Sequence, residues 1–151
     1  MTVTRLNLVE GTIFAVPTGK GDVVGVISRI GRGNVMIGYF FPPGILELEP
    51  EFATLNPTSA IAVLRFGPLG FKVDGWPIIG VIPDWQRDKW NMTTFKTQQT
   101  GIPGYLLNEY DNNDISKIIR TARVPSDPMN VPSDGLRGHR LIPAYLEKLL
   151  P

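Results

Sequence analysis

The sequence contains no cysteine and a single histidine, His139, among its 151 residues. The absence of cysteine excludes disulfide bonds, thiolate nucleophiles and thiolate metal ligands, and it suits a reducing compartment. One imidazole is too few for a histidine-based metal site. We therefore expect a protein that holds neither a metal nor a cofactor.

Long apolar runs and an excess of either charge are also missing. No stretch approaches the roughly 20 apolar residues that cross a bilayer, and residues 1–8 show no secretory pattern. Fifteen basic residues balance fourteen acidic ones, which leaves a net charge of +1. This balance gives no electrostatic reason to expect binding to nucleic acid or to an anionic membrane. We expect a cytoplasmic protein without membrane contact.

What remains is the composition of one β-rich domain spanning residues 1–151. Hydrophobic residues make up 42% of the chain, and a chain of this length can bury a core without staples. Sixteen glycines and fourteen prolines interrupt the apolar runs and predict short strands joined by turns. We expect an α+β fold, mainly β. An N-terminal antiparallel meander would form a strongly bent sheet or partly open barrel, with short helical turns and a C-terminal helix packed on it.

Apolar runs that end at glycine, proline or asparagine place the individual strands. The expected strands cover residues 12–17, 22–30, 35–41, 59–66, 76–83, 105–110 and 115–124. Apolar residues occupy both faces of 35–41, which predicts a strand covered on two sides. Residues 46–51 alternate apolar and acidic side chains, as an edge strand or exposed loop does. Residues 84–91 are irregular or one helical turn, 124–138 form a long loop, and 143–150 form the one clear helix.

Residues able to support catalysis lack the neighbours that a reaction needs. His139 has no Gly-x-Ser-x-Gly nucleophile motif to serve, and the turn at 19–25 does not match a nucleotide-binding loop. Two clusters of carboxylate residues are candidates for acid–base chemistry. The first is Glu47, Glu49 and Glu51, and the second is Glu109, Asp111 and Asp114. A solvated strand edge and a solvated turn explain them more simply. The second group also suits an acidic docking patch for a basic partner. We expect no enzyme.

The segment Trp85-Gln86-Arg87-Asp88-Lys89-Trp90 contains the residue types that dominate binding hot spots. The alternative is that both rings pack over an open end of the sheet, with each indole N–H bonded. The segment is also the nearest approach to a nucleic-acid-binding footprint, but its own Asp88 dilutes the positive charge. We place these residues at a protein-binding surface.

Three short motifs add an expectation of another kind. They are Gly11-Thr12-Ile13-Phe14-Ala15-Val16-Pro17 before Gly25-Val26-Ile27; Phe66-Gly67-Pro68-Leu69-Gly70 before Gly75-Trp76-Pro77-Ile78-Ile79-Gly80; and Trp85-Gln86-Arg87-Asp88-Lys89-Trp90-Asn91-Met92 before Phe95. Together they resemble the immunity protein 26 family of bacterial polymorphic toxin systems. The family often has proline where Asn91 stands here. The resemblance covers roughly residues 10–125.

The resemblance implies a β-rich immunity protein that protects a bacterium by binding a cognate toxin, without catalytic residues. It also implies that the motif residues have architectural roles: Gly11, Phe14, Pro17, Gly67, Gly70, Trp76, Pro77, Gly80 and Phe95. From the residues themselves, we expect the partner-binding set to be Trp85, Arg87, Asp88, Trp90, Glu109, Asp111 and Asp114. Two alternatives stay open: a small β-barrel that binds nucleic acid or the ribosome, and a hydrolase that uses the carboxylates.

Overall fold

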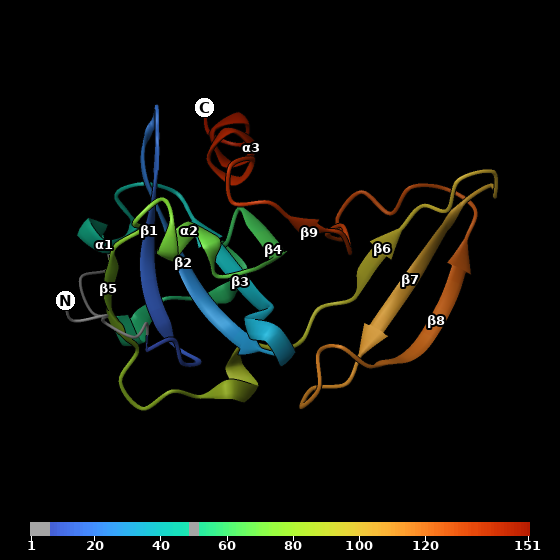
Figure 1. Cartoon of the computed structure of the whole chain (residues 1–151), viewed down its shortest axis with the longest axis horizontal. Coiled ribbons are helices and arrows are strands. Elements are labelled where there is room, and N and C mark those ends of the chain that lie inside the picture. The colour runs from blue at the N-terminus through green and yellow to red at the C-terminus, as the bar shows by residue number, and fades with distance from the viewer. Residues whose placement is uncertain (1–6, 49–51) are drawn as a thin grey trace.

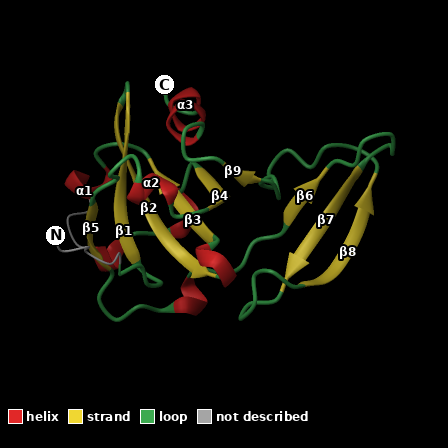
Figure 2. Cartoon of the chain, viewed as in Figure 1, coloured by secondary structure: helices red, strands yellow, loops and turns green. Residues whose placement is uncertain are grey.

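The structure is a computed structural model that describes residues 7–48 and 52–151, which form two sheets with short helices around them (Figures 1 and 2). Sheet A contains, in spatial order, β5 (Ile78–Val81), β1 (Thr12–Thr18), β2 (Gly21–Ile30), β3 (Met36–Phe41), β4 (Ala62–Phe66) and β9 (Leu136–Arg137). Sheet B contains β6 (Phe95–Thr97), β7 (Tyr105–Tyr110) and β8 (Ile118–Val124). The α-helices are α1 (Ile45–Leu48), α2 (Leu69–Lys72) and α3 (Ile142–Lys148), and single 3₁₀ turns occur at Arg32–Asn34, Phe52–Thr54, Pro57–Ser59 and Arg87–Lys89. The fold is α+β and mainly β, as predicted.

Sheet A begins as the predicted antiparallel meander, in which β1 to β4 pair with their sequence neighbours. Gly21, at a φ of 110°, closes the β1–β2 hairpin in a conformation that favours glycine. β5 then returns antiparallel to β1, and β9 adds in parallel beside β4. The resulting sheet is bent but not closed (Figure 1).

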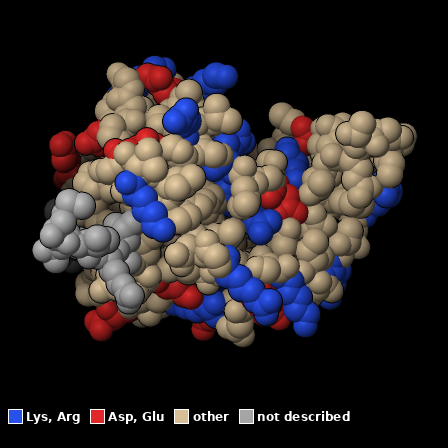
Figure 3. Space-filling view, in the orientation of Figure 1, with Lys and Arg blue, Asp and Glu red and all other residues tan. Residues whose placement is uncertain are grey.

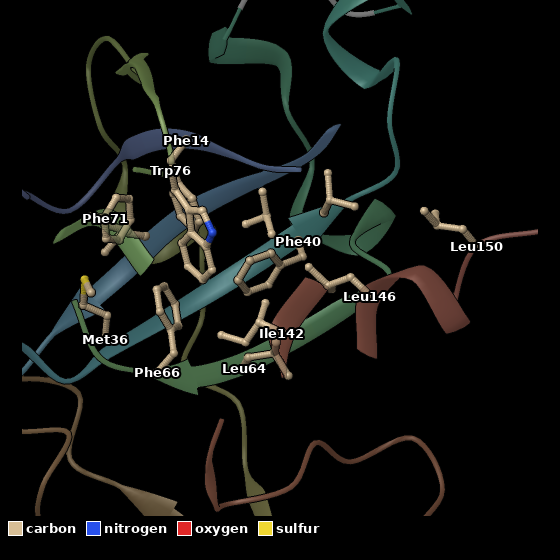
Figure 4. Close-up of a cluster of buried hydrophobic side chains, with 13 residues drawn as sticks. Phe14, Met36, Phe40, Leu64, Phe66, Phe71, Trp76, Ile142, Leu146 and Leu150 are labelled. Atoms are coloured by element: carbon tan, nitrogen blue, oxygen red, sulfur yellow. The ribbon is translucent and has the colours of Figure 1, made fainter. Parts of the chain in front are cut away.

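One face of sheet A carries the larger core, beneath α2 and α3 (Figure 4). Met36 and Phe40 of β3 point to this face. The rings of Phe14 and Trp76 stack there with centroids 6.0 Å apart and planes 10° apart. Leu146 of α3 is fully buried against them. A helix of two turns is marginal alone, so α3 depends on this docking.

The opposite face of sheet A has a core of its own. Tyr39 and Phe41 alternate with the previous pair along β3 and point to this side. Leu55, Ile82 and Trp90 cover them, and all three are buried. β3 is therefore buried on both faces, as the apolar residues on both faces of this strand predicted.

Several motif residues lie where backbone meets an aromatic ring. A Cβ added to Gly70 would lie 2.4 Å from the Trp76 ring, and one added to Gly80 would lie 2.7 Å from the Phe52 ring. Only glycine allows such close packing without displacing the ring. Gly67 differs, since nothing lies within 4 Å of its added Cβ.

Three segments depart from the expected elements. Residues 45–48 form the helical turn α1, in which the Gly44 carbonyl accepts from the amides of Glu47 and Leu48. Glu49, Pro50 and Glu51, the rest of the expected edge strand or loop, lie outside the described residues. A second helical turn, α2, follows the glycine–proline break that was expected to end a strand.

The third departure is β6, a strand that no sequence pattern predicted. The Lys96 amide donates to the Pro132 carbonyl and the Lys96 carbonyl accepts from the Asp134 amide, each at 2.8 Å. The expected loop 124–138 therefore covers the outer edge of β6 and then supplies β9. A three-residue strand is too short to show a period in sequence.

A buried ion pair joins sheet B to sheet A. Arg65 of β4 contacts the Asp134 carboxylate, and their side chains are 13% and 11% exposed. Tyr110 of β7 donates its hydroxyl to Asp134 at 2.6 Å, and Asn108 Nδ2 donates to the same carboxylate at 2.7 Å. The Arg65 guanidinium also lies 4.6 Å from the Tyr110 ring centroid. These contacts, together with the buried cluster of Ile37, Phe95, Tyr110 and Ile115, hold sheet B against sheet A.

Candidate functional site

Arg87 brings together the two segments that were expected to bind a partner. Its Nη1 donates to Asn113 Oδ1 at 2.6 Å, and its Nη2 donates to the Asn112 carbonyl in the β7–β8 turn. Its Nε donates to Glu10 Oε1 at 2.9 Å. Residues 84–91 and the β7–β8 turn therefore form one continuous area. We call Glu10, Arg87, Asp88, Asn112 and Asn113 the Arg87 surface.

The two tryptophans of the segment have different positions. Trp90 is 2% exposed and packs edge-on against Tyr39 at 5.2 Å, so it supports the surface from below. Trp85 is half-buried and stacks on Trp90 at 5.5 Å. Its Nε1 donates to Glu10 Oε1 at 3.2 Å. Gly11, at a φ of 89°, brings the chain against the Trp85 ring.

A buried arginine holds the β7–β8 turn from the inside. Arg29 of β2 is 2% exposed, and its Nε and Nη2 donate to Asn112 Oδ1 at 3.1 and 2.7 Å. Its Nη1 donates to the Ser28 carbonyl at 2.7 Å. Burial lowers the pKa of the Arg29 guanidinium, and the positive charge of Arg87 lowers it further. The turn is thus attached to the body of the protein by two arginines.

The turn carboxylates serve the turn itself. Asp111 Oδ1 accepts from the amides of Asn113 and Asp114 at 2.8 and 3.0 Å, and Asp114 Oδ1 accepts from the Ser116 amide at 3.1 Å. Such side-chain caps are the usual role of aspartate in turns.

Arginines stand beside the same carboxylates. Arg32 lies 4.0 Å from Asp114, and Arg120 lies 3.8 Å from Glu109. Basic and acidic side chains accordingly alternate along the lower rim of Figure 3. The area thus presents mixed charge, rather than the purely acidic patch that the sequence suggested.

A hollow of about 310 Å³ lies beside the Arg87 surface. Buried side chains of Leu55, Ile82 and Trp90 line its floor. Its rim is polar and includes Asp84 and Lys89, both exposed. A concave site with an apolar floor and polar rim is suited to receive one apolar side chain of another protein.

The remaining catalytic candidates lie apart from one another. His139 Nδ1 is 2.6 Å from Asp74 Oδ2, and this pair does not contact the turn carboxylates. Glu47, on α1, is exposed, and its carboxylate makes no hydrogen bond or ion pair with the residues that the structure describes. His139 and Glu109 do not line the hollow beside the Arg87 surface, nor do they line two further hollows, one at residues 57–63 and 129–132 and one at residues 98–103. Within the described part of the chain, these candidates do not place an acid and a base around any of these three hollows.

Two further findings concern residues 7–48 and 52–151. Their His, Asp and Glu side chains form no group of three or more that is arranged to hold a metal ion. No helix within them combines the length and apolar character needed to traverse a bilayer.

Sequence reasoning missed four residues that build the site: Glu10, Arg29, Asn112 and Asn113. Arg29 could have been noticed, because it is a cation inside the apolar run 23–30 of an expected strand. An inward arginine requires buried acceptors, which points to a partner elsewhere in the chain. Nothing in the sequence identified that partner as Asn112.

Comparison with known proteins returned no similar protein: no family model, curated protein or solved structure matches this chain.

Proposed function

We propose that this chain binds and neutralises a cognate bacterial toxin in the cytoplasm, by protein–protein interaction and without catalysis. The observation that carries the proposal is the position of Arg87, whose guanidinium joins two distant segments into one surface. Because that surface is held in place before a partner arrives, little conformational entropy is lost on binding.

The surface also has the composition of a binding area. Asp88, Asn112 and Asn113 are exposed and offer polar contacts, and the adjacent hollow offers an apolar floor. Stable interfaces combine a few anchored apolar side chains with a polar rim. An interface of standard size would bury about 1,600 Å² in total, which is sufficient to occlude an active site.

The specific form of the proposal, an immunity protein, rests on the three sequence motifs that resemble the immunity protein 26 family. In the structure, Gly70 and Gly80 pack against aromatic rings, which is an architectural role. The motifs therefore account for the scaffold, while the Arg87 surface supplies the contacts to the toxin.

Co-expression with the product of the neighbouring gene, which the proposal expects to carry a toxin domain, tests the proposal. We expect the wild-type chain to restore growth and to purify as a complex with the toxin. Asp88→Lys should weaken that complex by about tenfold or more, because it replaces a negative charge in the interface by a positive one. Asp88 makes no described hydrogen bond or salt bridge, so its replacement leaves the scaffold intact.

Asp22→Lys is the matched control, since Asp22 is also exposed but lies on β2, at the β1–β2 hairpin. It should bind and protect like the wild type. No complex and no protection with the neighbouring gene product would contradict the proposal. Salt-sensitive retention of nucleic acid on a filter would instead support the small nucleic-acid-binding module.

A further inference from the structure

Among the residues that the structure describes, no strand pairs with the outer side of β8, which is therefore an edge of sheet B. It pairs with β7 on one side and is the last strand of that sheet. Six of its seven residues are exposed. The opposite edge of the sheet differs, because the backbone of residues 132–134 bonds to β6 there. In an edge strand, alternate N–H and C=O groups point away from the sheet and can pair with another chain.

The side chains of β8 leave this edge accessible. Ile118 and Ile119 are 47% and 52% exposed, and no proline interrupts the strand. The irregularity in the β7–β8 pairing falls at Glu109 and Tyr110, near the start of β8, so the pairing from Arg120 onward is regular. A regular edge with exposed isoleucines is suited to strand addition.

We propose that β8 receives an extended acidic segment of a partner protein, which pairs with it as a fourth strand of sheet B. Residues 115–126 contain Lys117, Arg120 and Arg123 and no carboxylate. Arg120 and Arg123 lie on opposite faces of the strand, since side chains alternate. An added segment with acidic residues on both faces would therefore meet a cation on each face.

Other occupants fit this edge less well. If two copies of the chain paired through β8, the three cations of one copy would lie beside the three cations of the other, and like charges across strands are destabilising. Single-stranded nucleic acid requires aromatic platforms on which its bases stack, and residues 115–126 contain no aromatic side chain.

The edge is continuous with the Arg87 surface. The turn that Arg29 and Arg87 hold leads directly into β8. A segment paired along β8 would therefore end beside that surface, and one partner could contact both. The inference relies on the proposed function only in taking the partner to be a protein.

Peptide binding followed by amide NMR tests strand addition without any toxin. The probe is an eight-residue peptide of two Glu-Glu-Val-Val repeats, which presents carboxylates on both faces when extended. We expect it to shift the amide resonances of residues 118–124 and to slow their hydrogen exchange. A Lys-Lys-Val-Val peptide should not do so. The acidic peptide with alternate backbone nitrogens methylated should lose binding, because it cannot donate along the edge.

Charge reversal supplies the second arm of the test. Arg120→Glu with Arg123→Glu should weaken binding of the acidic peptide by about fivefold and allow binding of the basic peptide. The matched control is Arg140→Glu with Lys72→Glu, two exposed cations outside sheet B. It should leave the binding of both peptides unchanged.

Three results would overturn the inference. The first is that the acidic peptide leaves the amide resonances of β8 unshifted, and the second is that the methylated peptide binds as tightly as the unmethylated one. The third is that oligothymidine, and not the peptide, shifts these resonances. Failure here would leave the Arg87 surface untouched, because Asp88→Lys and the toxin complex test that surface separately.

Discussion

At the scale of single residues, the two tryptophans of the segment 84–91 have different roles because one is more deeply buried than the other. Trp90 is enclosed by Tyr39, Phe41 and Trp85, with ring centroids 5.2 to 5.9 Å away. Trp85 lies above it, with its indole N–H bonded to Glu10. The inner ring stabilises the core, and the outer ring shapes the Arg87 surface.

Trp90→Ala should lower the free energy of unfolding by about 3–5 kcal/mol, because it leaves a ring-sized cavity under the sheet. Trp85→Ala should cost less, since the ring is already partly in water. Urea denaturation of both variants measures the difference. Equal losses would show that the two rings are not ordered in this way.

The hydroxyl of Tyr110 makes the stability of the folded protein depend on pH. Burial raises its pKa to about 12, and the hydrogen bond to Asp134 adds to that effect. In the unfolded chain the pKa of tyrosine is about 10. The folded state therefore holds this proton more tightly, and the corresponding stability is fully present below about pH 10.

That stability should disappear as the pH rises through about 12. We expect the urea midpoint of the wild type to fall more steeply above about pH 10 than that of Tyr110→Phe, which lacks the titrating group. Tyr105→Phe, on the opposite face of β7, should retain the wild-type slope. Parallel curves for the wild type and Tyr110→Phe would contradict the assignment.

At the scale of elements, short segments are held by close packing rather than by their own length. α2 has four residues, and Gly70 within it lies against the ring of Trp76. A turn this short has no independent stability. Its position depends on the absence of a side chain at one residue.

Gly70→Ala should destabilise the protein by about 1–3 kcal/mol, since the new Cβ would lie 2.4 Å from the Trp76 ring. Gly67→Ala is the control, because nothing lies within 4 Å of its added Cβ. That variant should stay within about 0.5 kcal/mol of the wild type. Thermal unfolding of the pair checks the prediction, and a large loss for Gly67→Ala would count against it.

At the scale of the whole molecule, one buried carboxylate gathers several of the polar contacts between the two sheets. Asp134 accepts from Tyr110, Asn108 and Thr97 and pairs with Arg65. This carboxylate lies on the long segment that follows β8. The contacts of Asp134 therefore form only after the chain has passed through sheet B and returned.

Asp134→Ala should cost about 3–5 kcal/mol, because it leaves the Arg65 cation buried without a counter-charge. We also expect faster hydrogen exchange in β6 to β8 than in β1 to β3. Asp127→Ala removes a more exposed ion pair, with Lys96, and should cost less than about 1 kcal/mol. Uniform exchange across both sheets of Asp134→Ala would refute this account of the junction.

Local pattern was sufficient for much of the fold. The meander β1 to β4, the hairpin β7–β8 and the terminal helix each have a short-range signal: apolar runs, turn residues, or a stripe at helical spacing. β6 has three residues and gave no such signal, and its position depends on hydrogen bonds to the distant residues 132–134.

The sequence by itself determined that this protein is β-rich, without cysteine and nearly neutral, and it identified residues 84–91 and 109–114 as segments of interest. Only the tertiary structure decided that these segments adjoin, that Trp90 is buried, and that β8 is left as an open edge. The physical reason is that hydrophobic periodicity and turn residues determine structure only over a few consecutive residues. The contacts of Arg87 and Arg29 with the β7–β8 turn instead join residues 25 to 83 positions apart.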